Sequence, residues 1–501
     1  MSRERFTELE RRAGEIWDFY KALMLAGWDQ QTVMPPGGAK VRPHVLATLA
    51  KAMHDAWVDE RLGALLEGLR DFEESQGYDS YEASLIRLLR YDREREVRVP
   101  AELREERMRV SGEAYAVWVE ARRTSDFSLF LPYVERQVEL CRRYAACFDV
   151  DEPYDALLDE FEPGMKTAEV REVFARMKEG LVPLIEEASR REVDDSFLET
   201  EFPVAPQQEL ERLVLDRFGF RDGEWRLDPT VHPFASSQGT SDIRMTTRYQ
   251  YGDLSLFSSM HEGGHGLYEH NVDPAFERTP LCRGASLAFH ESQSLGYENL
   301  VGRNIAFWRW CYPHLQRVLP EPFRKVDLET FHAAINRVKP SLIRVDADEA
   351  TYGLHIILRF ELEQDLIDGN VDPADLSEIW NARMGEYLGV EVPDDAHGVL
   401  QDVHWARGYL GYFSTYALGN IVAAQLWERM REDLPDIDAQ LEQAELGPLG
   451  DWMREHVWRH GRKYMPRELL DRVVGGGLDA EPLLRYLRTK LGIAEPAGAA
   501  S

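Results

Sequence analysis

Residues 243–270 read IRMTTRYQYGDLSLFSSMHEGGHGLYEH. From Ile243 to Tyr249, Ile, Met, Thr and Tyr alternate with Arg and Thr, as in a strand that is buried on one side. A turn at Tyr251–Asp253 then leads into apolar residues at helical spacing, and Asn271 with the following Asp273-Pro274 pair ends that helix. This stretch predicts a strand followed by a helix.

The predicted helix carries the pattern of a metal site. His261 and His265 are four residues apart, so both imidazoles project from one face and can reach one ion. Glu262 lies beside them, where its carboxylate can accept a proton from a metal-bound water. Gly263 and Gly264 each cost about 1 kcal/mol relative to alanine within a helix, which indicates that a substrate or a neighbouring backbone passes close by. The alternative is a polar helix face with two solvated histidines.

A third metal ligand must come from elsewhere, because a catalytic zinc takes three protein ligands and keeps one open position. Glu269 and His270 lie on the same short helix, which cannot easily supply three convergent ligands. Glu291, in an apolar helical setting 26 residues after His265, leaves room for a loop and a returning helix. Spacing alone favours Glu291, and the adjacent His290 stays open as an alternative.

Most of the remaining chain reads as amphipathic helix. Apolar residues from Leu354 to Leu366 recur at helical spacing, and Gly369 follows as a left-handed C-cap. Similar patterns predict helices around residues 43–55, 102–122, 132–147 and 207–217. Strand signals are few, so we expect a mainly α protein without internal repeats, ending in a small-residue tail from Glu495 to Ser501.

Composition excludes several classes of protein. A net charge of -30 argues against nucleic acid or an anionic membrane as a partner, since both need positive surface. The chain has no run of about 18 apolar residues and no secretory signal after Ser2, so a cytoplasmic location is expected. Its four cysteines form no CxxC pair and no disulfide framework. A structural metal site usually closes with Cys or His, but the nearby Cys282 is interpreted as a packing residue.

Six motifs in register resemble the carboxypeptidase Taq family of metallocarboxypeptidases. The family's HPF, DxRxT, HExxH, HESQ, IRxxA and GxxQDxHW elements match His232–Phe234, Asp242–Thr246, His261–His265, His290–Gln293, Ile343–Ala347 and Gly398–Trp405. Residues 28–30, 34–38 and 159–165 are also similar to family sequence, so the resemblance spans about residues 28 to 420.

This resemblance implies a helical fold of the neurolysin and angiotensin-converting enzyme type, with a deep cleft and a small β-sheet beside it. It implies one catalytic domain over residues 1–501, in which about 1–100 form a helical region that covers the cleft and 230–420 hold the active-site motifs. It further implies a homodimer that removes single C-terminal amino acids from peptides, with broad specificity and poor action at proline. Within the family Glu291 is the third zinc ligand; cobalt fits the same ligand set.

Mechanism and resemblance together assign roles to further residues. Zinc held by His261, His265 and Glu291 would activate water while Glu262 takes its proton and passes it to the leaving amine. Tyr412, which the resemblance places where related helical zinc peptidases have such a tyrosine, is the candidate donor to the oxyanion, because a phenol donates while remaining neutral at pH 7. The alternative is a buried aromatic residue with a satisfied hydroxyl. Tyr409 and Tyr416 lie close enough in sequence to be confused with Tyr412.

Recognition of the substrate is assigned to four residues of the motifs. Arg344 and Arg244 are candidates for binding the C-terminal carboxylate, since a guanidinium forms a two-pronged hydrogen bond with it. His232 and His404 are candidates for holding the substrate backbone or the oxyanion. For each of the four, the alternative is an ordinary surface arginine or a satisfied core histidine.

Two rival functions remain at this point. A zinc oligoendopeptidase would use the same core in a cleft that is open at both ends. A catalytically inactive helical protein could instead bind peptides in that cleft, although it would need no general base at Glu262.

Overall fold

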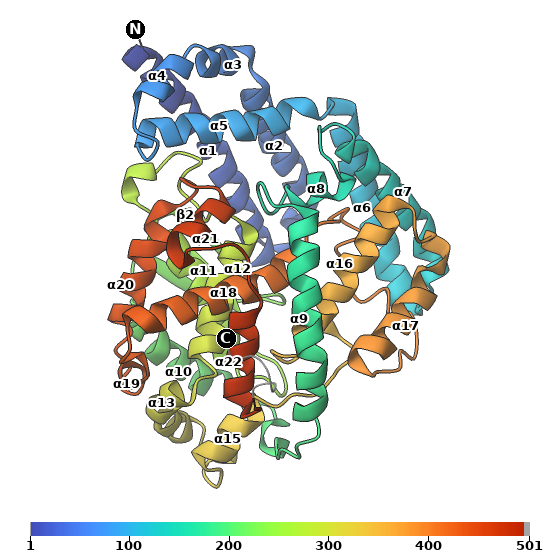
Figure 1. Ribbon diagram of the computed structural model, residues 1–501, viewed down its shortest axis with the longest axis vertical. Helices are drawn as coiled ribbons and strands as arrows, with labels where there is room; N and C mark the ends of the chain where they lie inside the picture. The colour runs from blue at the N-terminus through green and yellow to red at the C-terminus, as the bar shows by residue number, and fades with distance from the viewer. Residues whose placement is uncertain (1, 495–501) are drawn as a thin grey trace.

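Helices dominate the structure, a computed structural model that describes residues 2–494 (Figure 1). The N-terminal region contains α1 (Ser2–Gln31), α2 (Arg42–Val58), α3 (Glu60–Glu67), α4 (Arg70–Ser75) and α5 (Tyr81–Arg98). A second group contains α6 (Ala101–Thr124), α7 (Phe127–Ala145), α8 (Pro153–Leu158), α9 (Thr167–Ala188), α16 (Tyr352–Asp368) and α17 (Leu376–Leu388). The C-terminal tail predicted from Glu495 to Ser501 lies outside the described residues.

The third group of helices includes the one that carries His261 and His265. It contains α10 (Val204–Arg217), α11 (Ser255–His270), α12 (Leu287–Leu295), α13 (Ile305–Val318), α14 (Pro320–Phe323), α15 (Leu328–Ile335), α18 (Ser414–Asp433), α19 (Ile437–Leu441), α20 (Gly447–His456), α21 (Pro466–Val474) and α22 (Glu481–Leu491). A π-helical segment, Gly296–Val301, continues α12. Short 3-10 turns lie at Pro36–Lys40, Ser196–Leu198, Pro274–Phe276, Arg344–Asp346, Pro373–Asp375 and Trp458–His460.

A small sheet lies beside α11. Its strands are β1 (Trp225–Pro229), β2 (Ala235–Gly239) and β3 (Asp242–Thr247), in the order β1-β3-β2. β3 runs parallel to β1 and antiparallel to β2, so β2 is an edge strand of this sheet. The predicted strand and the helix that follows it are confirmed as β3 and α11.

The predicted helices are confirmed elsewhere too. α2, α6 and α10 cover three of the segments with helical periodicity, and α7 covers the segment predicted at 132–147 up to Ala145. α16 ends at Asp368, and the following Gly369, with a φ of 79°, is the left-handed cap. The protein is therefore mainly helical with a small sheet, as expected. Within residues 2–494, no helix combines the length and apolarity needed to cross a membrane.

Two apolar cores meet at α12 and α18. One core is built largely from α1, α5, α10, α11 and α13, and the other from α6, α7, α9, α16 and α17. α18 contributes to both cores: Val422 and Leu426 point into the first, while Leu418 and Ile421 point into the second. Because α12 packs against α18, the segment with Glu291 is held between the two cores.

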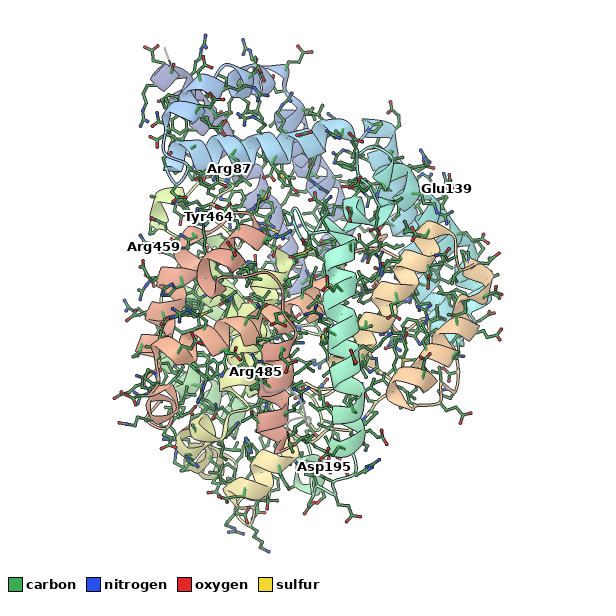
Figure 2. All side chains as sticks on the ribbon, viewed as in Figure 1. Arg87, Glu139, Asp195, Arg459, Tyr464 and Arg485 are labelled. Atoms are coloured by element: carbon green, nitrogen blue, oxygen red, sulfur yellow. The ribbon has the colours of Figure 1, made fainter. Side chains whose placement is uncertain are left out.

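The N-terminal helices are joined to the C-terminal part of the chain. Arg87 of α5 donates a hydrogen bond to the Lys463 carbonyl at 3.0 Å, and Figure 2 shows its side chain near Tyr464. Arg462 forms a half-buried ion pair with Asp92 of α5 at 2.8 Å. These contacts fix α5 beside the segment between α20 and α21.

Candidate metal centre and active site

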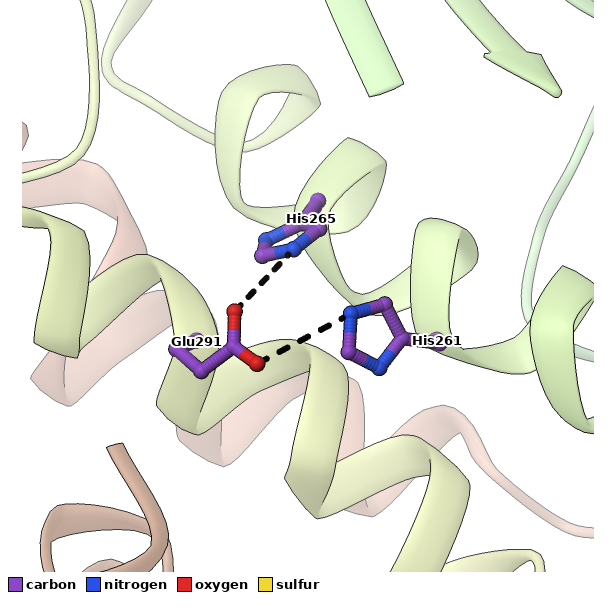
Figure 3. A group of neighbouring side chains, drawn as sticks. All are labelled: His261, His265 and Glu291. Carbon is purple, nitrogen blue, oxygen red and sulfur yellow. Dashed lines mark ion pairs between the residues drawn. The ribbon is translucent and has the colours of Figure 1, made fainter. Parts of the chain in front are cut away.

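Helix α11 holds the two candidate histidine ligands and the candidate base. His261 and His265 are one helical turn apart and point toward α12 (Figure 3). Apolar side chains on other faces of α11 are buried in the core: Leu256, Phe257, Met260 and Leu267. Burial of this apolar surface fixes the direction in which the histidines point.

Close packing explains one of the two glycines inside this helix. A Cβ on Gly264 would overlap the carbonyl oxygen of Gln293, so α11 can approach the backbone of α12 only with glycine there. A Cβ on Gly419 of α18 would lie 2.6 Å from the Glu291 Cβ, so α18 also approaches α12 closely. Gly263 meets only ordinary contacts. The prediction of a neighbouring backbone is thus confirmed for Gly264.

The start of α12 is fixed by two polar side chains. Ser286 is the N-cap, and its hydroxyl accepts a hydrogen bond from the Phe289 amide at 3.2 Å. The carboxyl group of Glu162, which follows α8, accepts one from the Ala288 amide at 2.5 Å. Glu291 therefore lies one turn beyond a doubly capped helix terminus.

Three side chains converge between α11 and α12 (Figure 3). His261 Nε2 lies 3.9 Å from Glu291 Oε1, and His265 Nε2 lies 3.7 Å from Glu291 Oε2. The three ligand atoms all fall within 4.8 Å of one another. Two imidazole nitrogens and one carboxylate oxygen are the donor set of a three-ligand catalytic site, so these residues fit a divalent metal ion.

The alternative ligands lie elsewhere around this centre. His290 Nε2 is 2.7 Å from Glu269 Oε1, and His290 Nδ1 is 3.3 Å from His265 Nδ1. These two residues pair with each other behind His265. His270 Nδ1 contacts the Thr240 carbonyl oxygen at 2.6 Å.

A carboxylate behind His261 was missed by the sequence analysis. Glu298 Oε2 lies 2.9 Å from His261 Nδ1, and Glu298 Oε1 forms a 3.3 Å ion pair with Arg303. Such a carboxylate orients the imidazole and fixes which nitrogen faces the metal. Glu298 follows Glu291 by seven residues, or two helical turns, and this spacing was the signal that could have found it.

The candidate base is buried, and the three candidate ligands are half-buried. Burial raises the pKa of Glu262 to about 8, and its Oε2 has no hydrogen-bond partner among residues 2–494. A carboxylate with a raised pKa is suited to hold a proton between two steps of a reaction. Burial also lowers the pKa of His265 well below its ordinary value, which favours the neutral imidazole that binds a metal.

These residues line a cleft of about 380 Å³. Its walls come from α1, β2, α11, α12 and the start of α18, and include Tyr20, Lys21, Met24, Pro233, Ser237, Glu269, Arg283, Leu287, Tyr412 and Tyr416. Lys21 donates to the Ser237 carbonyl at 3.0 Å and thereby joins α1 to the edge strand β2. A metal centre with an adjacent unpaired carboxylate in such a cleft can hydrolyse a bound peptide.

A comparison with protein families shows to which family the chain belongs. The carboxypeptidase Taq (M32) metallopeptidase family matches residues 8–491. The chain belongs to this family. Membership supports metal-dependent carboxypeptidase activity, as the sequence motifs predicted.

Relatives of the M32 chain match it over almost their full length. Carboxypeptidase 1 of Bacillus subtilis is 39% identical over 480 residues, which cover 95% of each chain. Thermostable carboxypeptidase 1 of Thermus thermophilus is 39% identical and covers 93% of this chain and 94% of its own. The crystal structure of the M32 carboxypeptidase from Deinococcus radiodurans R1 aligns with a TM-score of 0.95 at 37% identity, over 98% of this chain and 99% of that one.

Two predicted substrate ligands of this M32 chain, Arg344 and His404, lie in a buried polar network. Arg344 donates through Nε and Nη2 to Asp402 Oδ1 at 3.0 and 2.9 Å. Arg359 of α16 donates to Asp402 Oδ2 at 2.7 Å. Burial opposes ionisation of Asp402, but the two guanidinium groups outweigh it and hold the pKa of this carboxyl well below its usual range. His404 Nε2 lies 3.2 Å from the Tyr416 hydroxyl.

The other two predicted substrate ligands, Arg244 and His232, also lie outside the cleft lining, as do Arg344 and His404. Arg244 pairs with Asp242 at 2.9 Å and stacks over the Trp28 ring at 4.5 Å. His232 is exposed. The neighbours of each residue, Pro233 and Ile243, do line the cleft. Among the predicted oxyanion donor and substrate ligands, the structure thus places Tyr412 in the cleft lining, but none of these four residues.

Buried aromatic contacts fix the candidate oxyanion donor. The rings of Phe161 and Tyr412 meet edge to face at 5.0 Å, and burial raises the pKa of Tyr412 to about 12. Its hydroxyl therefore stays protonated at neutral pH and can donate a hydrogen bond. Tyr416 also lines the cleft, whereas Tyr409 is 45% exposed and lines a neighbouring cavity.

Proposed function

We propose that the protein is a zinc-dependent carboxypeptidase that releases single amino acids from the C-termini of peptides, with broad specificity and poor action at proline. The observation that carries this proposal is the convergence of His261, His265 and Glu291 beside the unpaired carboxylate of Glu262 in one cleft. The metal would be held by these two imidazoles and one carboxylate. Zinc suits this donor set, and cobalt is a possible substitute.

Each residue around the centre then has its own role in the reaction. A bound divalent ion supplies Lewis acidity, which polarises the scissile carbonyl and activates water. Glu262 accepts the proton of the attacking water and passes it to the leaving amine, a role supported by its burial and its raised pKa of about 8. Glu298 and the His290–Glu269 pair keep the two imidazoles oriented.

Tyr412 and His404 supply hydrogen bonds in the proposed mechanism. The neutral phenol of Tyr412 donates to the oxyanion that forms at the attacked carbonyl. His404 acts on the same side of the cleft by holding the hydroxyl of Tyr416. Arg344, Arg244 and His232 remain predictions as substrate ligands. Arg344 and Arg244 would have to share their guanidinium groups with Asp402 and Asp242.

Assembly and location also remain predictions. The family resemblance implies a homodimer, and the sequence favours the cytoplasm. The strong negative charge argues against nucleic acid as a partner.

The test measures free amino acids released from a blocked dipeptide and from a longer peptide. It compares wild type, chelator-treated protein and Glu262→Gln, with bound metal quantified in each. Stepwise C-terminal release that stops on chelation, and that stops in Glu262→Gln while one zinc stays bound, is the expected result. Internal fragments would indicate an oligoendopeptidase, and no release by metal-loaded wild type would contradict the proposal.

A further inference from the structure

The catalytic cleft adjoins a second cavity of about 670 Å³, which we call the side chamber. The side chamber lies between the N-terminal helices and the loops before α9 and α12. Three residues line both spaces: Tyr20, Arg283 and Leu287. The two cavities therefore adjoin each other at Arg283.

Arg283 differs from the other arginines of the side chamber. Each of the others has a carboxylate partner: Arg95 pairs with Asp159, Arg104 with Glu96, Arg107 with Glu160 and Arg462 with Asp92. Arg283 forms no ion pair with any residue in the described range 2–494. Its guanidinium carbon lies 5.8 Å from the centre of the Tyr20 ring. In a chain with a net charge of -30, a half-buried guanidinium without a carboxylate partner is unusual.

The backbone next to Arg283 is hydrogen-bonded to α11, the helix that carries the two candidate histidine ligands. The Gly284 amide donates to Glu269 Oε1 at 3.0 Å, and the Ala285 amide donates to the Tyr268 hydroxyl at 3.1 Å. Both acceptors belong to α11, close to His265. Arg283 is thus held in a defined position relative to the metal centre, as a residue that binds substrate needs to be.

We propose that Arg283 binds a carboxylate of the peptide substrate. This inference rests on the proposed peptidase function. A guanidinium matches a carboxylate with two parallel hydrogen bonds, and the pair is strongest where both groups are partly shielded from water. The carboxylate has two possible sources. It is either the C-terminal group of the peptide or an Asp or Glu side chain preceding the scissile bond that enters the side chamber.

Peptide affinity measured in a variant that does not cleave the peptide tests this inference independently of catalysis. Zinc-loaded Glu262→Gln is titrated calorimetrically with a neutral peptide and with versions that carry glutamate at each of the three positions before the C-terminal residue. The same titrations are made after adding Arg283→Gln, Arg283→Lys or Arg107→Gln. Arg107 lines the same chamber but is already paired with Glu160, so it is the matched control.

The two sources give different results. If a side chain is bound, Arg283→Gln raises Kd about tenfold for a glutamate peptide and leaves the neutral peptide unchanged. If the C-terminal group is bound, Kd rises by a similar factor for every peptide. In both cases Arg283→Lys restores part of the affinity and Arg107→Gln has little effect. Unchanged Kd values for all peptides, or an equal loss in Arg107→Gln, would overturn the inference. Failure of wild type to release amino acids would refute the proposed function without altering this test.

Discussion

The carboxylate of Glu298 lies 2.9 Å from Nδ1 of His261, on the side of the imidazole away from Glu291. The π-helical segment that carries Glu298 directly continues the helix that carries Glu291. One continuous piece of chain thus supplies both a candidate metal ligand and the group that orients another. π-helical turns of this kind are frequent at functional sites.

We expect Glu298→Ala to weaken zinc binding about 10- to 100-fold, because His261 loses the acceptor that orients its ring. Competition with a chelator of known affinity measures this change. Glu209→Ala, which removes an exposed glutamate paired with Arg317, is the control and should leave affinity unchanged. Equal zinc affinities for Glu298→Ala and wild type would show that His261 does not depend on this contact.

A second prediction concerns the close approach of α18 to α12. Gly419→Ala places a Cβ 2.6 Å from the Glu291 Cβ, so we expect it to reduce the free energy of unfolding by about 1–3 kcal/mol and to weaken zinc binding. Gly112→Ala is the matched control, since its Cβ would meet no atom within 4 Å in the exposed face of α6. That substitution should stabilise the protein by up to about 1 kcal/mol. Urea unfolding measures both, and stabilisation by Gly419→Ala would contradict the packing argument.

The sequence predicted the centre of the site better than its surroundings. His261 and His265 are separated by one helical turn, so their convergence follows from local geometry. Glu291 needed a loop whose path the sequence does not specify, and spacing alone left His290 open. The structure shows why the distinction is subtle: His290 lies beside His265, but it faces Glu269.

Contacts between distant segments could not be predicted from residue patterns. Arg344 was expected to bind substrate, yet its pairing with Asp402 depends on how two distant segments of the chain meet. The pairing of Arg359 with the same carboxylate could not be predicted either, because Arg359 is fully buried in α16 and far from Asp402 in the sequence. Helical periodicity predicted that α16 would be buried, but it gave no information on which charged groups would be buried with it.

A third prediction uses the pH dependence of stability. Burial raises the pKa of Glu162 to about 8, above the value near 4.3 of an unfolded glutamate. Folding therefore takes up a proton between these pH values. The stabilising contribution of Glu162 is complete below about pH 4.3 and falls as pH rises toward 8, by up to about 1.4 kcal/mol per pH unit.

In Glu162→Gln the side chain at this position is uncharged at every pH, so the free energy of unfolding lacks this decline. We therefore expect its free energy of unfolding to increase relative to wild type between pH 5 and pH 8, as measured by urea unfolding at several pH values. Glu160→Gln, two residues away and exposed, is the control. Parallel pH profiles for wild type and Glu162→Gln would mean that Glu162 folds in its ionised form.

A fourth prediction separates the tyrosines near the metal centre. Tyr412→Phe removes only a hydroxyl, so we expect kcat to fall about 100- to 1000-fold with little change in KM, because an oxyanion donor acts in the transition state. Tyr409→Phe should leave kcat nearly unchanged, since that residue lines the side chamber rather than the catalytic cleft. Steady-state kinetics on one blocked dipeptide, with zinc content matched, provide the measurement. A large loss of kcat in Tyr416→Phe but not in Tyr412→Phe would transfer the role to Tyr416, whose hydroxyl is held by His404.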